Sequence, residues 1–238
     1  LLKIENFDFA QLVITNTLNT STNQLILNAA VFELAQLCEI KMQDNQIDLL
    51  ITYEINNNQL LSNSFTKFDS TYNNLLNKAI FIYDSLRIKS NDFISTYHLA
   101  DIKYKIQNDF DGAFELYNNV YKYSNDSEYK QFALSRLIDV SIASGNIPQA
   151  KNIINNNLKD TKDMEIIRDI KSAQIEFYEG DRDSTIKNCK LLLAEISNKH
   201  QYYNDILDIL SITYLCDNNE DFEKYSTIKL KLFQNSIV

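Results

Sequence analysis

The stretch Asp109-Phe110-Asp111-Gly112-Ala113-Phe114-Glu115-Leu116-Tyr117-Asn118-Asn119-Val120-Tyr121 indicates most clearly how this chain folds. Its apolar and aromatic residues recur at the spacing of one helix face, which has a period of about 3.6 residues. These residues are Phe110, Ala113, Phe114, Tyr117, Val120 and Tyr121. Asp109 and Asp111 stand where carboxylates can cap free amides and face the positive end of the helix dipole. The spacing predicts an amphipathic helix that starts near Asp109.

The same start recurs twice further along the chain, as Asn146-Ile147-Pro148-Gln149-Ala150 and Asp181-Arg182-Asp183-Ser184-Thr185. The small residues Ala113, Ala150 and Thr185 are 37 and 35 residues apart. Another helical pattern precedes each start, and Gln107-Asn108, Gly145 and Gly180 fall in the turns between the two helices, where a positive φ ends the first helix. A period of this length, made of two helices that meet at small residues, is typical of an α-solenoid.

The runs Leu99-Ala100-Asp101-Ile102-Lys103-Tyr104 through Ala113, and Ala173 to Gly180-Asp181, resemble tetratricopeptide repeats (TPRs). In that family a small residue of the first helix packs against a small residue of the second. The resemblance implies an all-α fold, a right-handed α-solenoid of stacked antiparallel helix pairs. It covers residues 93–238. The repeats are degenerate, because the chain has no Trp for the first-helix aromatic, no Pro at the end of each repeat, and Ile138 at a position where the family has a small residue.

A second likeness concerns Phe177-Tyr178-Glu179-Gly180-Asp181, followed by Ser197-Asn198-Lys199 and Asn204-Asp205-Ile206-Leu207. This order is similar to a block in repeat proteins of bacterial cell envelopes. The resemblance implies a bacterial protein, with its location open between the periplasm or envelope and the cytoplasm. The chain starts at Leu1 rather than Met, so a removed leader or anchor stays possible.

The first ninety residues follow the repeat less closely. Ser21 or Thr22 is expected to cap a helix that ends near Cys38, and a second helix is expected over residues 46–56. The pattern loosens from Asn57 to Lys67, where Ser, Asn and Thr lower helix propensity, and we expect an irregular segment there. A long helix follows near Ser70 to Ile88. Its expected inward residues are Leu75, Leu76, Ala79, Phe81, Ile82 and Leu86.

Later helix starts are expected at Ser90-Asn91-Asp92, Ser127, Thr161 and Asn198, and the last helix pair at residues 201–216 and 219–235. We expect one solenoid over residues 1–238, with irregular repeats over 1–91 and more regular TPR-like repeats over 92–238. Solenoid ends normally carry polar capping helices, and neither end of this sequence shows one. The sequence therefore predicts a segment of a longer array.

Charge and composition exclude several classes of function. The net charge is −9 and the Lys and Arg residues form no stripe, which argues against a nucleic-acid partner. No apolar run is long enough to cross a bilayer, so we expect no membrane insertion by this segment. With 45% hydrophobic and 23% charged residues, the composition is that of an ordinary folded protein.

No residue pattern for catalysis or cofactor binding is present. His98 and His200 lie about a hundred residues apart without a partner motif, and the three glycines stand in separate repeats rather than in a phosphate-binding loop. Cys38, Cys189 and Cys216 form no CxxC and are expected to be reduced and buried, although a Cys189–Cys216 bridge stays open. We therefore expect no metal, no cofactor and no enzymatic activity.

The leading hypothesis is a non-catalytic scaffold that holds a peptide or protein partner on the concave surface formed by the first helices. By position in the repeat, the residues expected to face that partner are His98, Lys105, Ser135, Asp139 and Gln174. Two alternatives remain: a structural or assembly platform in a bacterial envelope complex, and a helical accessory domain of a larger enzyme.

Overall fold

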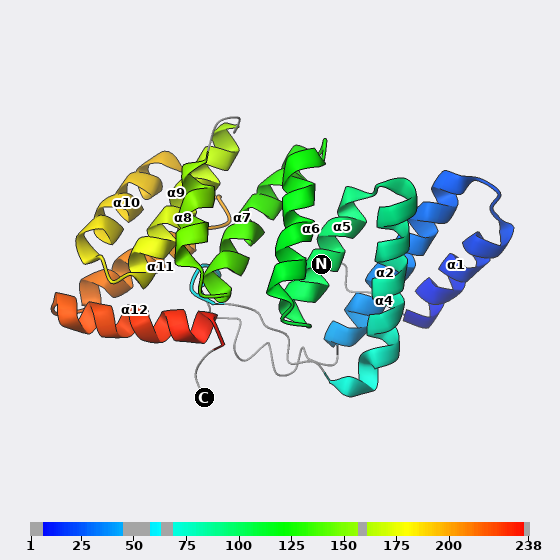
Figure 1. Ribbon diagram of the computed structural model, residues 1–238, viewed down its shortest axis with the longest axis horizontal. Coiled ribbons are helices and arrows are strands. Elements are labelled where there is room, and N and C mark those ends of the chain that lie inside the picture. The colour runs from blue at the N-terminus through cyan, green and yellow to red at the C-terminus, as the bar shows by residue number, and fades with distance from the viewer. Residues whose placement is uncertain (1–6, 45–57, 63–68, 157–160, 236–238) are drawn as a thin grey trace.

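The computed structural model describes residues 7–44, 58–62, 69–156 and 161–235; within these residues all regular secondary structure is helical and no strand is present (Figure 1). The all-α prediction is confirmed for this part of the chain. In order, the helices are α1 (Phe7–Thr20), α2 (Gln24–Asp44), the 3-10 helix η1 (Ser70–Tyr72), α4 (Asn73–Ser90), α5 (Phe93–Lys105), α6 (Phe110–Tyr123), α7 (Ser127–Ala143), α8 (Ile147–Asn155), α9 (Lys162–Tyr178), α10 (Arg182–Glu195), α11 (Tyr203–Leu215) and α12 (Asn219–Phe233).

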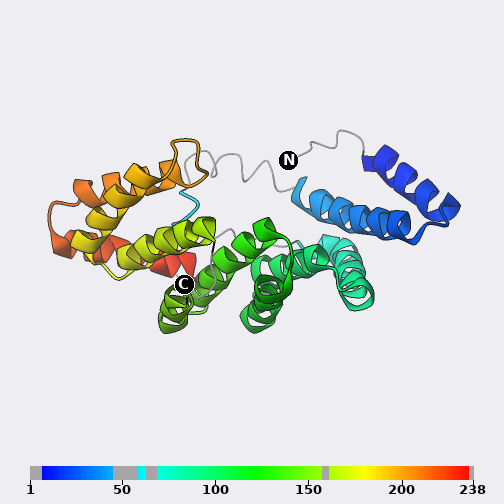
Figure 2. The same cartoon turned by 90° about the horizontal axis from the view of Figure 1, so that it is seen from above.

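Consecutive helices pack against their neighbours, as expected for a helical repeat. Seen from above, the helices follow a curved path, with α5 and α7 toward its inner side and α6 and α8 toward its outer side (Figure 2). The inner helices α5, α7 and α9 also contact one another in that order. This arrangement places the side chains of successive inner helices next to each other.

The small residues that set the period lie where the helices meet. Ala113, Ala150 and Thr185 are completely buried, one in each of α6, α8 and α10. Ala100, Ala133 and Ala173 of the inner helices are also buried. Alanine-sized side chains allow two helices to approach closely, because helix spacing depends on the side chains at the contact.

The turns between the paired helices have the predicted backbone. Gly145 and Gly180 have φ values of 79° and 75°, and Asn108 occupies the corresponding turn with φ of 54°. Asp109 and Asp181 then cap α6 and α10 by accepting a hydrogen bond from the amide three residues later. In these three helix pairs, a left-handed residue is therefore followed by a capping side chain.

Three of the predicted helix starts need correction. Asn23 rather than Ser21 or Thr22 precedes α2 and accepts a hydrogen bond from the Leu25 amide. Asp126 caps α7, with Ser127 as the first helical residue. Asn198 starts no helix, because α11 begins at residue 203 without a side-chain cap. Asp and Asn carry strong acceptors on short side chains, and here they take the cap in place of adjacent Ser or Thr.

The long helix predicted near residues 70–88 is present as η1 followed by α4, with one error in its register. Phe81, expected inside, is 72% exposed, whereas Tyr83 is completely buried. The buried face follows Leu76, Ala79 and Tyr83, so a side chain two residues before Tyr83 points away from it. The helix expected over residues 46–56 lies outside the described residues, whereas residues 58–62 lack helix, as the loosened pattern predicts.

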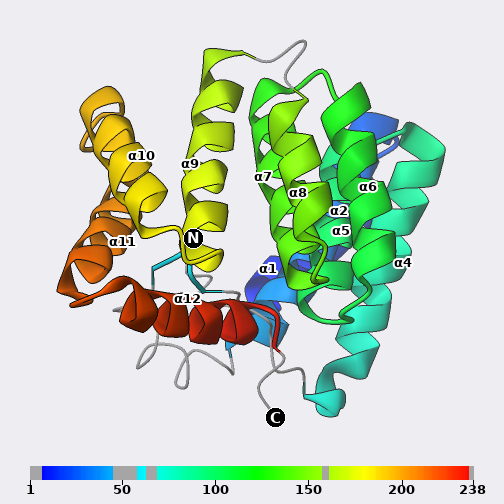
Figure 3. The ribbon, with the colours of Figure 1, turned by 60° about the vertical axis from the view of Figure 1, so that its left-hand side comes forward.

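The last helix departs from regular stacking. Figure 3 shows α12 lying across the lower ends of α9 and α10. Phe222 meets Phe177 of α9 edge to face at 5.4 Å, and Phe233 meets Tyr178 at 5.6 Å between ring centroids. Just beyond α12, the side-chain amide of Gln234 donates a hydrogen bond of 3.0 Å through Nε2 to the backbone carbonyl of Ile142, at the end of α7. Thus α12 supports α9 from its C-terminal end.

Candidate functional site

A row of charged side chains crosses the inner helices, and we name it the inner charge row. Its members are Asp101 and Lys105 of α5, Arg136 and Asp139 of α7, and Lys171 of α9. The ion pairs run from Lys105 to Asp101, Arg136, Asp139 and Lys171 in that order, so that the row links three helices that are neighbours in space. The helical period brings these residues together, since Asp101 to Lys105 spans four residues and Arg136 to Asp139 spans three.

Asp101 joins Lys105, at one end of the row, to Arg136. It accepts hydrogen bonds from Lys105 and from the hydroxyl of Tyr117, and it lies 3.7 Å from Nε of Arg136. Burial alone would raise its pKa, but the positive charges of Lys105 and Arg136 and the two hydrogen bonds outweigh burial and lower the pKa to about 2. Asp101 is therefore ionised at neutral pH.

The other end of the row is a buried ion pair. Nζ of Lys171 lies 2.6 Å from Oδ1 of Asp139, and their side chains are only 3% and 8% exposed. Nη1 of Arg136 lies 3.4 Å from the second oxygen of Asp139. Removing these charges from water costs hydration free energy, and the attraction between the paired charges must offset that cost. The pair fixes α9 against α7 at the point where residues 58–62 approach.

Residues 58–62 lie on the inner side of the curve against α9 and the start of α11 (Figure 2). They form a tight turn in which Oδ1 of Asn58 accepts hydrogen bonds from the amides of Leu60 and Leu61, at 3.0 and 3.1 Å. The side chain of Asn58 thereby satisfies the Leu60 amide, while the Leu61 amide also donates to the backbone carbonyl of Asn58. Leu60 and Leu61 are 1% and 3% exposed and belong to the main hydrophobic core.

Three side chains hold this turn, and we name them the turn site: Gln174, Tyr178 and Asp205. Nε2 of Gln174 and the hydroxyl of Tyr178 both donate to the carbonyl of Leu60, at 2.5 and 3.2 Å. Oδ1 of Asp205 accepts a hydrogen bond of 3.0 Å from the Gln59 amide, and the Asp205 carbonyl accepts one of 2.6 Å from Nδ2 of Asn58. The turn site thus forms most of its hydrogen bonds with the backbone of the turn, while Leu60 and Leu61 pack into the hydrophobic core.

The turn site also holds two acceptors that the turn does not use. Oε1 of Gln174 and Oδ2 of Asp205 are buried and accept no hydrogen bond from the described part of the chain. Burial raises the pKa of Asp205, since a buried carboxylate with one unused oxygen is poorly solvated. Buried polar atoms without partners are rare in folded proteins and call for an explanation.

The five residues predicted from the repeat occupy different environments. Lys105 and Asp139 belong to the inner charge row, and Gln174 belongs to the turn site. Ser135 is 7% exposed on α7. His98 lies further toward α2 and α4: its Nδ1 is 3.5 Å from Glu39 and its ring stacks on Tyr83 at 5.2 Å. The structure therefore groups Lys105, Asp139 and Gln174 along one face and places His98 in a contact between helices.

Sequence reasoning missed two of the residues that hold the turn, and for different reasons. Tyr178 lies four residues after Gln174 on α9, so the helical period could have found it. Asp205 contacts the turn across 146 residues of sequence, and no local pattern reports such a contact.

The described residues show neither a metal-binding cluster nor a reactive cysteine. They contain no group of three or more His, Cys, Asp or Glu placed to bind a metal ion. All three cysteines are free, so the Cys189–Cys216 bridge is not formed. Burial, helped by the charge of Glu176, raises the pKa of Cys189 to about 12, so at neutral pH its thiol is protonated and a poor nucleophile.

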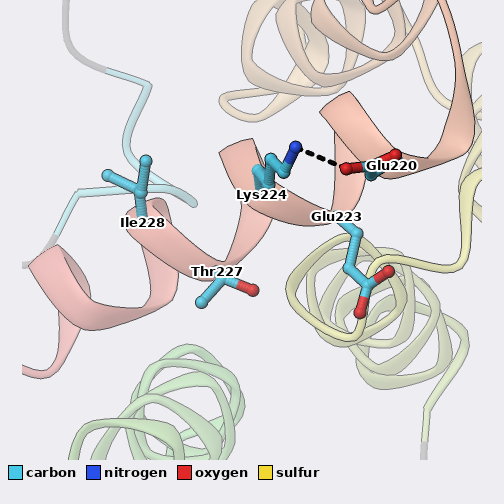
Figure 4. Close-up of a pocket in the computed structure, with 5 residues that line it drawn as sticks. All are labelled: Glu220, Glu223, Lys224, Thr227 and Ile228. Carbon is cyan, nitrogen blue, oxygen red and sulfur yellow. Dashed lines mark hydrogen bonds and ion pairs between the residues drawn. The ribbon is translucent and has the colours of Figure 1, made fainter.

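A hollow of about 420 Å³ lies beside α12, lined by residues of that helix (Figure 4). The lining residues are Glu220, Glu223, Lys224, Thr227 and Ile228. Nζ of Lys224 is 2.6 Å from Oε1 of Glu220, which is an exposed pair one helical turn apart. Such a pair is typical of a solvated helix surface. We therefore place the candidate site on the inner side of the curve rather than here.

No family model, no curated protein and no solved structure matches the chain. Among the described helices, none combines the length and the apolar character needed to span a membrane. The site must therefore be interpreted from its own geometry.

Proposed function

We propose that this chain is a non-catalytic scaffold: a right-handed, TPR-like α-solenoid that binds a peptide or protein partner along its inner helices. One observation carries the proposal. The turn formed by residues 58–62 is more than a hundred residues away in sequence from the helices that hold it. It lies on α9 and α11 and is bound through its backbone and two leucine side chains. Recognition of this kind is what a peptide-binding surface requires, since backbone contacts give affinity and side-chain burial gives selectivity.

The inner charge row supports the same function. Lys105, Arg136 and Asp101 keep 23%, 31% and 21% of their side-chain surface exposed, so they remain accessible to a partner. Their ion pairs hold each charged group in a defined position, which lowers the entropy lost on binding. Fixed charges of both signs favour a partner whose own charges are arranged in a complementary pattern.

Selection from a random peptide library displayed on phage, against the full chain, tests the proposal. Enriched peptides are then synthesised, and their dissociation constants are measured by fluorescence polarisation. We expect Lys105→Gln to weaken binding by about tenfold or more, because a hydrogen bond to a charged group is worth about 1.5 kcal/mol or more.

Lys122→Gln is the matched control, because Lys122 is exposed on the outer helix α6 and undergoes the same chemical change. It should change affinity by less than about twofold, as expected for a charge outside the binding surface. Failure to enrich any peptide, or equal losses in the two variants, would count against binding on the inner helices.

A further inference from the structure

We propose that the turn formed by residues 58–62 is an internal stand-in for the partner, and that the partner supplies a turn with two adjacent leucines and a basic side chain. This inference rests on the proposed function and specifies its site, its ligand chemistry and its regulation. The chain would then compete with its own partner, and binding would require release of residues 58–62 from α9 and α11.

The bound turn shows which ligand features the site accepts. Gln174 and Tyr178 both donate a hydrogen bond to the carbonyl of Leu60. Asp205 accepts a hydrogen bond from the amide of Gln59. None of these three contacts depends on the identity of a side chain in the turn. Any polypeptide that forms the same turn, with apolar residues at the positions of Leu60 and Leu61, can make the same contacts.

The unused acceptors show what the internal turn lacks. Oε1 of Gln174 and Oδ2 of Asp205 flank the turn, are buried, and receive no donor from the described residues. Gln59, the residue whose amide meets Asp205, carries a neutral side chain that is exposed to solvent. A lysine at this position of a partner is longer and more flexible, so that its ammonium group could fold back from solvent and donate a hydrogen bond to the Asp205 carboxylate. The acidic chain, with a net charge of −9, also favours a basic partner.

Competition within one chain is strong even when each contact is weak. A tethered segment has an effective concentration of about 1 mM at its site. If the free peptide binds with a dissociation constant of about 0.1 mM, the tethered turn would raise the apparent dissociation constant roughly tenfold. Removing the turn from the site should therefore expose the binding activity.

The test uses a fluorescein-labelled peptide with the sequence of residues 58–62, Asn-Gln-Leu-Leu-Ser, and fluorescence polarisation. It is titrated with the wild-type chain and with the variant Leu60→Ser/Leu61→Ser, which alters the turn and leaves α9 and α11 intact. We expect the variant to bind about tenfold more tightly than the wild type, which is the full factor that removal of the tethered competitor provides. A peptide with serine in place of both leucines should bind neither protein.

A second peptide, Asn-Lys-Leu-Leu-Ser, tests the basic side chain. We expect it to bind the double variant at least about threefold more tightly than the first peptide, because it pairs with a buried carboxylate. Adding Asp205→Asn to the double variant should abolish this advantage, since asparagine keeps an acceptor for the amide and removes the charge. Equal binding of the two peptides before that change would overturn the basic-partner part of the inference.

Folding of the double variant is checked by circular dichroism and thermal denaturation. If it does not fold, Asn58→Ala takes its place, because it removes the cap of the turn and keeps both buried leucines. We expect a smaller gain, about threefold tighter binding, because this change loosens the turn but keeps the two leucines that hold it in the core.

The outcomes separate this inference from the function on which it rests. Equal affinity of the wild type and a folded variant would show that residues 58–62 do not compete, and would overturn the inference while the scaffold function stands. No binding by a folded variant would also overturn it. The scaffold function itself fails only if library peptides do not bind through the inner helices.

Discussion

At the scale of single residues, the buried pair of Lys171 and Asp139 is the contact on which the inner side depends most. Both side chains are almost fully buried, and the pair joins α9 to α7. Removing one member of a buried ion pair leaves the other charged without a partner, which costs about 3–5 kcal/mol in proteins. Arg136 remains near Asp139 at 3.4 Å, so we expect the lower end of this range.

Lys171→Met should therefore lower the free energy of unfolding by about 3 kcal/mol, measured by urea denaturation. Lys224→Met is the matched control, because Lys224 forms an ion pair of the same 2.6 Å length with Glu220 on an exposed face. The control should lose less than about 0.5 kcal/mol. Similar losses in the two variants would show that Lys171 is not buried as described.

A second prediction concerns Asp101 and the dependence of stability on pH. Its folded pKa of about 2 lies below the ordinary value of 3.8, so its ionised form stabilises the fold by about 2 kcal/mol at neutral pH. This contribution is complete above about pH 4 and is lost as the pH falls toward 2; about half remains at pH 3.

The check is the difference in unfolding free energy between the wild type and Asp101→Asn, followed by urea denaturation at pH 7, 5 and 3. The difference should stay constant from pH 7 to 5 and shrink at pH 3. Carboxylates whose pKa burial raises, such as Asp169 and Glu176, act in the opposite direction but are common to both proteins and cancel. A difference independent of pH would contradict the assigned environment of Asp101.

At the scale of elements, the turns between paired helices are defined by glycine. Gly145 and Gly180 both have positive φ, yet their surroundings differ. An added Cβ at Gly145 would meet nothing nearer than 4.0 Å, whereas at Gly180 it would lie 3.3 Å from the backbone of Glu223 in α12. The same substitution therefore tests the backbone alone at one turn and the backbone plus helix packing at the other.

Gly145→Ala should cost about 1 kcal/mol, the strain of a left-handed conformation in a residue with a Cβ. Gly180→Ala should cost more, about 2 kcal/mol, because the neighbouring backbone must also move. Thermal denaturation of the two variants gives the comparison. If Gly145→Ala is the more damaging substitution, the packing of α12 described here is wrong.

The elements also show how far sequence reasoning reached. The starts of α6, α8 and α10 follow from local features, namely a capping Asp or Asn, a small residue four positions later and an apolar face. The position of α12 does not, because Phe222 and Phe233 meet α9 at residues about forty-five and fifty-five positions earlier in the chain. Local patterns predict a helix and its buried face, and they do not predict which distant helix covers that face.

At the scale of the whole molecule, the repeat predicted a line of inner helices but could not predict what lies on them. Lys105, Asp139 and Gln174 were predicted to face inward because inner-facing positions recur with the period of the repeat, and their role in binding stays a prediction. The segment that contacts Gln174 is residues 58–62. Its sequence showed only one signal, a poor helix propensity. The central claim is therefore that the inner side is a binding surface that the chain itself fills.

A crystal structure of Leu60→Ser/Leu61→Ser bound to the Asn-Lys-Leu-Leu-Ser peptide tests this claim most directly. The account predicts the peptide on α9 and α11, with one carbonyl accepting from Gln174 and Tyr178 and the lysine paired with Asp205. A peptide bound on the outer helices, or beside α12, would contradict it.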